Sequence, residues 1–138
     1  MLKMKKSKVR DPIISQYKLE RIQIDLVDIR CYAQHNDDYN WILNIIDHFT
    51  CYAWSFALKR KLAEDIASAL LLWLEFNCPS MFMQSDEGGE FVNGVISILS
   101  GSYNITNITG GPYNPSINGK VERANQTLKR LLSKYYII

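Results

Sequence analysis

The sequence contains few cysteines and histidines. Its three cysteines, Cys31, Cys51 and Cys78, are scattered without C-x-x-C spacing, and such an odd, unpatterned set argues against a disulfide framework. A reducing intracellular compartment, nuclear or cytoplasmic, fits this cysteine usage best. The two histidines, His35 and His48, do not complete a Cys/His set, so we expect no structural zinc site.

Long apolar runs are also missing. The longest runs, such as residues 67–76, are interrupted by polar residues, here Ser68 and Glu75. They are shorter than the span of about 20 residues that a helix needs to cross a bilayer. The basic segment at residues 1–10 is not followed by the apolar stretch of a secretory signal. We therefore expect no membrane partner. Residues 1–10 are predicted to be a basic N-terminal tail, either solvated or acting as a nuclear localisation patch.

The composition is that of one globular domain. Of the 138 residues, 47% are hydrophobic and 22% are charged, and internal repeats and low-complexity linkers are lacking. The net charge of +2 is unevenly distributed, because residues 11–119 hold thirteen acids and six basic residues while residues 120–138 hold five basic residues and one acid. A basic helix beside a carboxylate-rich centre suits a metal-dependent enzyme that acts on a polyanion. A solvated charged helix explains the basic residues alone about as well.

Hydrophobic periodicity predicts an α/β domain. Alternating or β-branched runs predict strands at residues 21–29, 40–46, 52–58, 81–83 and 103–106. Helical spacing of apolar residues predicts helices at residues 61–76, 88–100 and 118–136. This order indicates a mixed sheet with helices on both sides. We expect most of the large aromatic side chains, Trp41, Trp54 and Trp73, to lie in the core.

Three carboxylates are the candidate catalytic residues. Asp25 lies in the first predicted strand, Asp86 follows the fourth, and Glu122 lies in the last helix, with thirty-five residues between Asp86 and Glu122. The three could meet if the first and fourth strands are neighbours. Together they would repel one another unless a hard divalent cation stabilised the charged forms. Two such ions about 3.5 to 4 Å apart promote in-line displacement at phosphorus, so Mg²⁺, replaceable by Mn²⁺ in vitro, is the expected cofactor.

Two other acids remain alternatives for the first carboxylate. Asp28 and Asp47 both lie in or beside predicted strands. By strand parity Asp28 lies on the opposite face from Asp25, so both cannot serve one site.

The segment at residues 114–125, NPSINGKVERAN, is predicted to be a loop that leads into a helix. Pro115 and Gly119 shape the loop, and Lys120, Glu122 and Arg123 then lie on the opening turns of the helix. The free N–H groups of a helix N-terminus attract phosphate. This context favours a functional role for Glu122 over that of an ordinary surface acid.

Four segments resemble the integrase catalytic core of the RNase H-like superfamily, in its retroviral and gypsy-type retrotransposon branch. They are QIDLVDIR at 23–30, DHFTCYAWSFALK at 47–59, SDEGGEF at 85–91 and PYNPSINGKVERANQTLK at 112–129. The resemblance covers roughly residues 11–134, and its last segment is the most specific. It implies an RNase H-like fold with a mixed five-stranded sheet flanked by helices. Residues 11–138 would form the core domain, with its C-terminal part truncated.

The resemblance also implies the chemistry. Family members trim the 3′ ends of element DNA and use the freed hydroxyls to attack target DNA, so DNA is the expected partner, together with a homodimer or higher oligomer. The residues that would bind the two metal ions are Asp25, Asp86 and Glu122. The residues that would contact DNA are Tyr113, Asn118, Lys120, Arg123 and Lys129. Lys129 lies two turns beyond Glu122 on the same helix face, although a merely solvated lysine would occupy the same place.

The chain departs from the family pattern at a few positions. Glu87 replaces the asparagine that usually follows the second aspartate, and Ser116 and Ile117 replace a Gln-Ser pair. The family's N-terminal zinc domain and C-terminal DNA-binding domain are not expected here. These departures keep open a catalytically silent, transposon-derived nucleic-acid-binding or dimerisation module. An RNase H-type ribonuclease would require recognition of 2′-hydroxyls, and the loop sequence favours the integrase interpretation over it.

Overall fold

The computed structural model describes residues 14–85, 94–109 and 115–135. The elements, in chain order, are β1 (Arg21–Asp28), η1 (Arg30–His35), β2 (Trp41–Asp47), β3 (Ala53–Leu58), α1 (Ala63–Phe76), β4 (Phe82–Ser85), α2 (Gly94–Ser102), β5 (Thr106–Thr109) and α3 (Pro115–Tyr135). The predicted order of strands and helices is confirmed. The short 3₁₀ helix η1 was not predicted.

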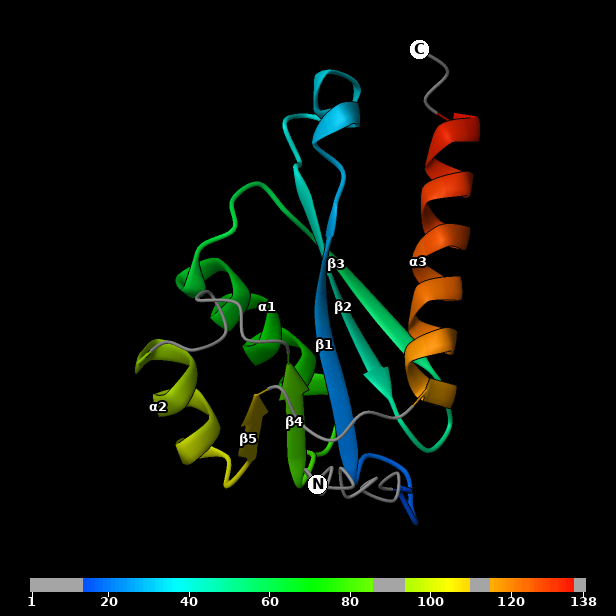
Figure 1. Ribbon diagram of the computed structural model, residues 1–138. Coiled ribbons are helices and arrows are strands. Elements are labelled where there is room, and N and C mark those ends of the chain that lie inside the picture. Colours follow the sequence, from blue (N-terminus) through cyan, green and yellow to red (C-terminus); the bar gives the residue numbers. More distant parts are fainter. Residues whose placement is uncertain (1–13, 86–93, 110–114, 136–138) are drawn as a thin grey trace, which may run out of the picture.

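The strands form one mixed sheet with the order β3-β2-β1-β4-β5. β1 pairs antiparallel with β2, and β2 with β3, whereas β4 runs parallel to both β1 and β5. Helices α1 and α2 lie on one side of the sheet and α3 lies on the other (Figure 1). The predicted five-stranded sheet with helices on both sides is therefore confirmed, and so is the condition that the first and fourth strands are neighbours.

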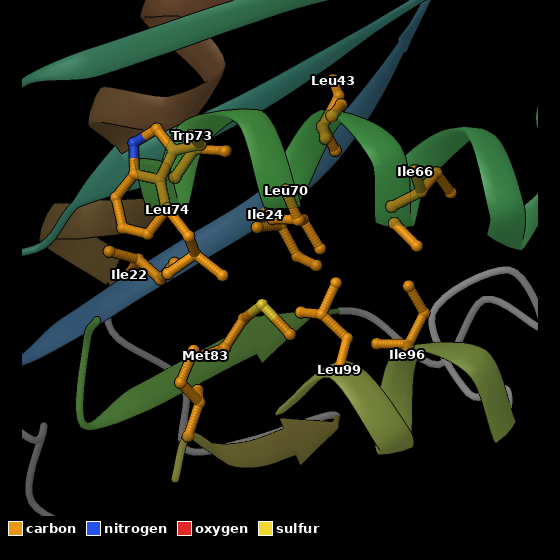
Figure 2. Close-up of a cluster of buried hydrophobic side chains, with 14 of the residues drawn as sticks. Ile22, Ile24, Leu43, Ile66, Leu70, Trp73, Leu74, Met83, Ile96 and Leu99 are labelled. Carbon is orange, nitrogen blue, oxygen red and sulfur yellow. The ribbon is translucent and has the colours of Figure 1, made fainter. Parts of the chain in front are cut away.

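Strict alternation along β1 directs its side chains to two different surroundings. Ile22 and Ile24 are buried in the main core, while Gln23 and Asp25 face the opposite side of the sheet. Helices α1 and α2 cover the apolar face, and Figure 2 shows their side chains closing over those of β1 and β4. The largest fully buried side chain is Trp73 of α1. Burying a side chain of the Leu, Ile or Met type contributes about 1.5–3 kcal/mol, so this face anchors the sheet.

The opposite face holds two smaller apolar clusters beneath α3. Val27 and Ile42 pack against Leu128 and Leu132 of the helix. Closer to the start of α3, Val121 packs against Ile46 of β2. Because these contacts recur at helical spacing, they fix which side of α3 faces the sheet. The helix therefore lies over β1 and β2.

Two predicted boundaries were wrong. The strand expected at residues 103–106 is β5 at Thr106–Thr109. Tyr103 and Asn104 instead form the turn that ends α2, in which Asn104 has a positive φ of 55° and the N–H of Ile105 donates to the carbonyl of Ser100 over 2.8 Å. A left-handed residue after a helix is a common stop signal, and here it outweighed the β-propensity of the tyrosine and isoleucine.

The last helix begins at Pro115, three residues earlier than predicted. Proline is favoured in the first turn because an N–H there has no partner within the helix. Gly119 therefore lies inside α3 rather than in a loop, and Lys120, Glu122 and Arg123 lie beyond the opening turn. For the second predicted helix the described part is α2 from Gly94, and residues 88–93 lie outside the described residues. Within residues 14–85, 94–109 and 115–135, none of the helices combines the length and apolar character of a bilayer-spanning segment.

Candidate active site

Strand β1 and helix α3 carry two of the predicted carboxylates, Asp25 and Glu122. Asp25 lies in the middle of β1, and β4 pairs with β1 in parallel through Gln23 and Gln84. Strand β4 ends at Ser85, directly before Asp86. Asp86 itself lies outside the described residues. The structure thus places the first carboxylate and the end of the strand preceding the second on adjacent strands.

Helix α3 is joined to Asp25 by a hydrogen bond. The Nδ2 atom of Asn125 donates to Oδ2 of Asp25 over 3.0 Å. Glu122 precedes Asn125 by three positions on the same helix, and residues three apart are neighbours on a helix surface. Its side chain is exposed. The arrangement brings together the segments that hold two of the predicted carboxylates, Asp25 and Glu122.

Behind Asn125 the hydrogen bonds continue across two further strands. The Nδ2 atom of Asn44 donates to Oδ1 of Asn125 over 2.8 Å. The hydroxyl of Ser55 donates to Oδ1 of Asn44 over 2.6 Å. Asp25, Asn44 and Ser55 stand directly opposite one another on β1, β2 and β3. Four side chains from four elements therefore form one line of hydrogen bonds that ends at Asp25.

The structure gives the two alternative aspartates other partners. Asp28 is exposed and pairs with Arg30, whose Nη2 lies 2.8 Å from Oδ2 of Asp28. Hydrogen bonds from Arg30 lower the pKa of Asp28 to about 2. Parity had placed Asp28 away from Asp25, and its exposed pairing with Arg30 agrees with this.

Asp47 is fully buried and holds a turn together. Its carboxylate accepts hydrogen bonds from the backbone N–H groups of Leu19 and Phe49, both over 3.2 Å, and from the hydroxyl of Thr50 over 2.7 Å. These local donors satisfy the buried carboxylate oxygens with hydrogen bonds. These contacts give Asp47 a structural role and leave Asp25 as the first carboxylate of the candidate site.

A second cluster of polar side chains lies further along the same sheet face. Nη1 of Arg21 donates to Oε1 of Gln84 over 3.2 Å, and Nε2 of His48 lies 3.1 Å from Oε1 of Gln23. Burial, with the nearby charge of Arg21, lowers the pKa of His48 to about 4. His48 is therefore a neutral imidazole near neutral pH.

The described basic residues of α3 differ in their contacts. Nζ of Lys120 lies 3.3 Å from Sγ of Cys51, and Nε of Arg123 donates to the carbonyl of Gly119 over 3.4 Å. Lys129 is exposed, and its charge helps to lower the pKa of Asp28 at the end of β1. Of the remaining predicted DNA contacts, Tyr113 and the side chain of Asn118 lie outside the described residues. The predicted DNA-contacting role of all five residues stays a prediction.

The donor chemistry of the site suits a hard divalent cation. Carboxylate oxygens are the ligands that Mg²⁺ prefers, and β1 and α3 each carry one of the predicted carboxylates, Asp25 and Glu122. Across the described part of the chain, no three His, Cys, Asp or Glu side chains gather into a possible metal site. Since Asp86 is not among those residues, the predicted set of three carboxylates is not tested by this observation.

Two of the polar residues in the line of hydrogen bonds, Asn44 and Ser55, were not expected from the sequence. Asn44 is only 4% exposed. The available signal was its position as the one uncharged polar residue in the apolar strand WILNIID, because an amide buried in a sheet needs partners. Its partners could not be deduced, since they lie on a neighbouring strand and a distant helix.

Comparisons with known proteins identify chains with a similar fold. The crystal structure of the catalytic core domain of BIV integrase superposes with a TM-score of 0.68 and 26% identity, and covers 85% of this chain and 71% of that one. A cryoEM structure of the simian T-cell lymphotropic virus intasome, in complex with PP2A regulatory subunit B56 gamma, has a TM-score of 0.72 at 23% identity and covers 97% of this chain and 46% of that one.

Sequence comparison finds relatives among Pol polyproteins. The retrovirus-related Pol polyprotein from transposon RE2 of Arabidopsis thaliana is 33% identical over 95 residues, which are 65% of this chain and 6% of that polyprotein. The chain spans 9% of the length of the Pro-Pol polyprotein of Simian foamy virus type 1 and 6% of the length of the transposon RE2 polyprotein. No family model matches the sequence.

Proposed function

We propose that this chain is a metal-dependent polynucleotidyl transferase of a retroelement. It belongs with the integrase catalytic cores and shares their RNase H-like fold, and this relationship supports the proposal. Its substrates are the 3′ ends of element DNA and a target DNA. The reactions are removal of terminal nucleotides and transfer of the freed 3′-hydroxyl to a target phosphate. The Pol polyprotein relatives and the BIV integrase core support this reaction class.

The observation that carries the proposal is the hydrogen bond from Asn125 to Asp25. It joins the middle of β1 to a helix one hundred residues later in the chain, at a point one turn after Glu122. The apolar contacts between α3 and the sheet, through Val121 before Asn125 and Leu128 and Leu132 after it, do not require this hydrogen bond. A carboxylate placed beneath a helix that bears a second carboxylate is an arrangement that serves cation binding better than stability.

The proposed ligands of the metal ions are Asp25, Asp86 and Glu122. Two bound Mg²⁺ ions would activate the attacking hydroxyl and stabilise the leaving oxygen at phosphorus. Within the described chain, β1 holds Asp25 in a rigid sheet and Asn125 restrains its carboxylate. Lys129, exposed on α3, is proposed to contact the phosphate backbone of the bound DNA end, with Lys120, Arg123, Tyr113 and Asn118 as further contacts.

The experiment that tests the proposal is disintegration, the reversal of strand transfer on a branched DNA. It is run with Mg²⁺ and with Mn²⁺ on the wild type, on Glu122→Gln and on Glu75→Gln. Glu75 is a matched control, because it is an exposed glutamate on α1, across the sheet from α3. We expect activity that requires the cation, is lost in Glu122→Gln and is retained in Glu75→Gln.

Other results would lead elsewhere. A folded wild type that binds DNA but shows no cleavage or transfer with either cation would contradict the proposal and favour the silent binding module. Glu87→Asn would then be the first reversion to make, because Glu87 adds a negative charge directly after Asp86. Cleavage confined to the RNA strand of a hybrid duplex would identify the ribonuclease instead.

A further inference from the structure

Asn44 occupies a position in β2 where an apolar residue would be expected. It is 4% exposed, and the residues on either side of it, Leu43 and Ile45, are fully buried. A buried amide without partners costs about 1–3 kcal/mol for the group left unsatisfied. Asn44 avoids this cost because both of its polar atoms are used, Nδ2 by Asn125 and Oδ1 by Ser55. The specific partners suggest a role beyond packing.

A carboxylate accepts hydrogen bonds, so Asn125 can bond to Asp25 only through its Nδ2 atom. Its Oδ1 atom then faces Asn44 and requires a donor there, which Nδ2 of Asn44 provides over 2.8 Å. Reversing the Asn125 amide would set its oxygen against the carboxylate and its NH₂ group against that of Asn44. Only one orientation satisfies every partner.

We propose that Asn44 is a positioning residue, which acts through Asn125 to hold the Asp25 carboxylate in one orientation for cation binding. Without Asn44, the Asn125 amide could also turn its NH₂ group away from Asp25, because each end of the amide can bond to water or to a neighbour. The NH₂ group of Asn44, fixed in the sheet, removes that freedom. The catalytic consequence rests on the function proposed above, whereas the orientation of the Asn125 amide does not.

Ser55 contributes less to this control. Its hydroxyl can donate or accept, so it would remain bonded to Asn44 in either orientation of that amide. Ser55 is also exposed, and water can replace it. The residue whose chemistry sets the direction is therefore Asn44.

The test removes the donor at position 44. Asn44→Asp keeps the shape and the acceptor for Ser55 but replaces the NH₂ group with an oxygen. With carboxylates on both sides of it, the Asn125 amide is expected to lose its single orientation and to share its NH₂ group between Asp25 and residue 44. The control is Asn107→Asp. Asn107 also accepts a hydrogen bond from a serine, Ser100 Oγ, over 2.8 Å, but it lies on β5, which β4 separates from β1.

The first measurement is Mn²⁺ affinity of the full chain without DNA, by titration calorimetry. Disturbing a residue that orients a metal ligand typically lowers affinity about 10–100-fold. The sign is decisive, because an added negative charge near the site would by itself strengthen cation binding. We expect Asn44→Asp to weaken Mn²⁺ binding by that factor and Asn107→Asp to leave it within about twofold of the wild type.

The second measurement is independent of activity and of metal. In NMR spectra of the wild type, the side-chain amide protons of Asn125 should show NOEs to the β protons of Asp25. In Asn44→Asp these NOEs should weaken, and new NOEs to the β protons of residue 44 should appear. If Asn44→Asp does not fold, Asn44→Leu removes the donor without adding charge and is measured in the same two ways, with weaker Mn²⁺ binding and loss of the fixed NOE pattern expected.

The outcomes separate the two proposals. Unchanged or stronger Mn²⁺ binding in Asn44→Asp, or an unchanged NOE pattern, overturns the role of Asn44. A wild type that binds no Mn²⁺ overturns the proposed metal-dependent function instead, and the NOE comparison still decides whether Asn44 orients the Asn125 amide.

Discussion

Acidification should destabilise this protein through His48. The side chain is 8% exposed, and its pKa falls from 6.5 to about 4 because burial and the neighbouring Arg21 disfavour the charged imidazolium. Between these two pKa values the unfolded chain binds a proton that the folded chain does not. The contribution of His48 to stability is therefore fully present above pH 6.5 and is lost as the pH falls toward 4.

The size of the effect follows from the two pKa values. At about pH 4.5 an unfolded His48 is almost fully protonated, whereas the folded one is about one-quarter protonated. Moving from pH 7 to pH 4.5 should cost about 2 kcal/mol of unfolding free energy from this group alone. Carboxylates titrate over the same range, so the informative quantity is the difference between the wild type and a variant that lacks the imidazole.

The assay is urea denaturation at pH 7 and pH 4.5 for the wild type, His48→Gln and His35→Gln. Glutamine does not titrate and can still bond to Gln23. His35, exposed at the end of η1, provides the matched control. We expect the wild type and His35→Gln to lose about 2 kcal/mol more than His48→Gln between the two pH values. An equal loss in all three proteins would refute a neutral, buried His48.

Two further predictions concern the aspartates that the structure separates from the site. Asp47→Ala removes a fully buried carboxylate that accepts from three backbone N–H groups and the Thr50 hydroxyl, so it should lower the unfolding free energy by about 1–3 kcal/mol, measured by urea denaturation. An unchanged unfolding free energy would contradict this role. Arg30→Gln should raise the pKa of Asp28 from about 2 toward 3.8 in a carboxyl NMR titration, because the hydrogen bonds from Arg30 are the main cause of the low value. An unchanged pKa would show that this pairing does not form in solution.

Local periodicity was sufficient to predict most elements, because it reports contacts between near neighbours. The alternation in β1 placed Ile22 and Ile24 on the core face and Asp25 on the other, and the sheet confirmed this. The helical spacing around Trp73 likewise predicted α1. The misplaced boundaries at β5 and at the start of α3 lie where single residues, Asn104 and Pro115, control the backbone.

The sequence by itself determined the order of strands and helices and the two-faced character of β1, and it nominated Asp25, Asp86 and Glu122 as the candidate carboxylates. Only the tertiary structure decided which aspartate stands beneath α3, because Asp25, Asp28 and Asp47 differ in their partners and not in their chemistry. It also decided the role of Asn44, whose hydrogen bonds run to β3 and to a helix eighty-one residues away. Hydrogen bonds between distant segments depend on how the sheet and helix pack together, and no local pattern of residues encodes that packing.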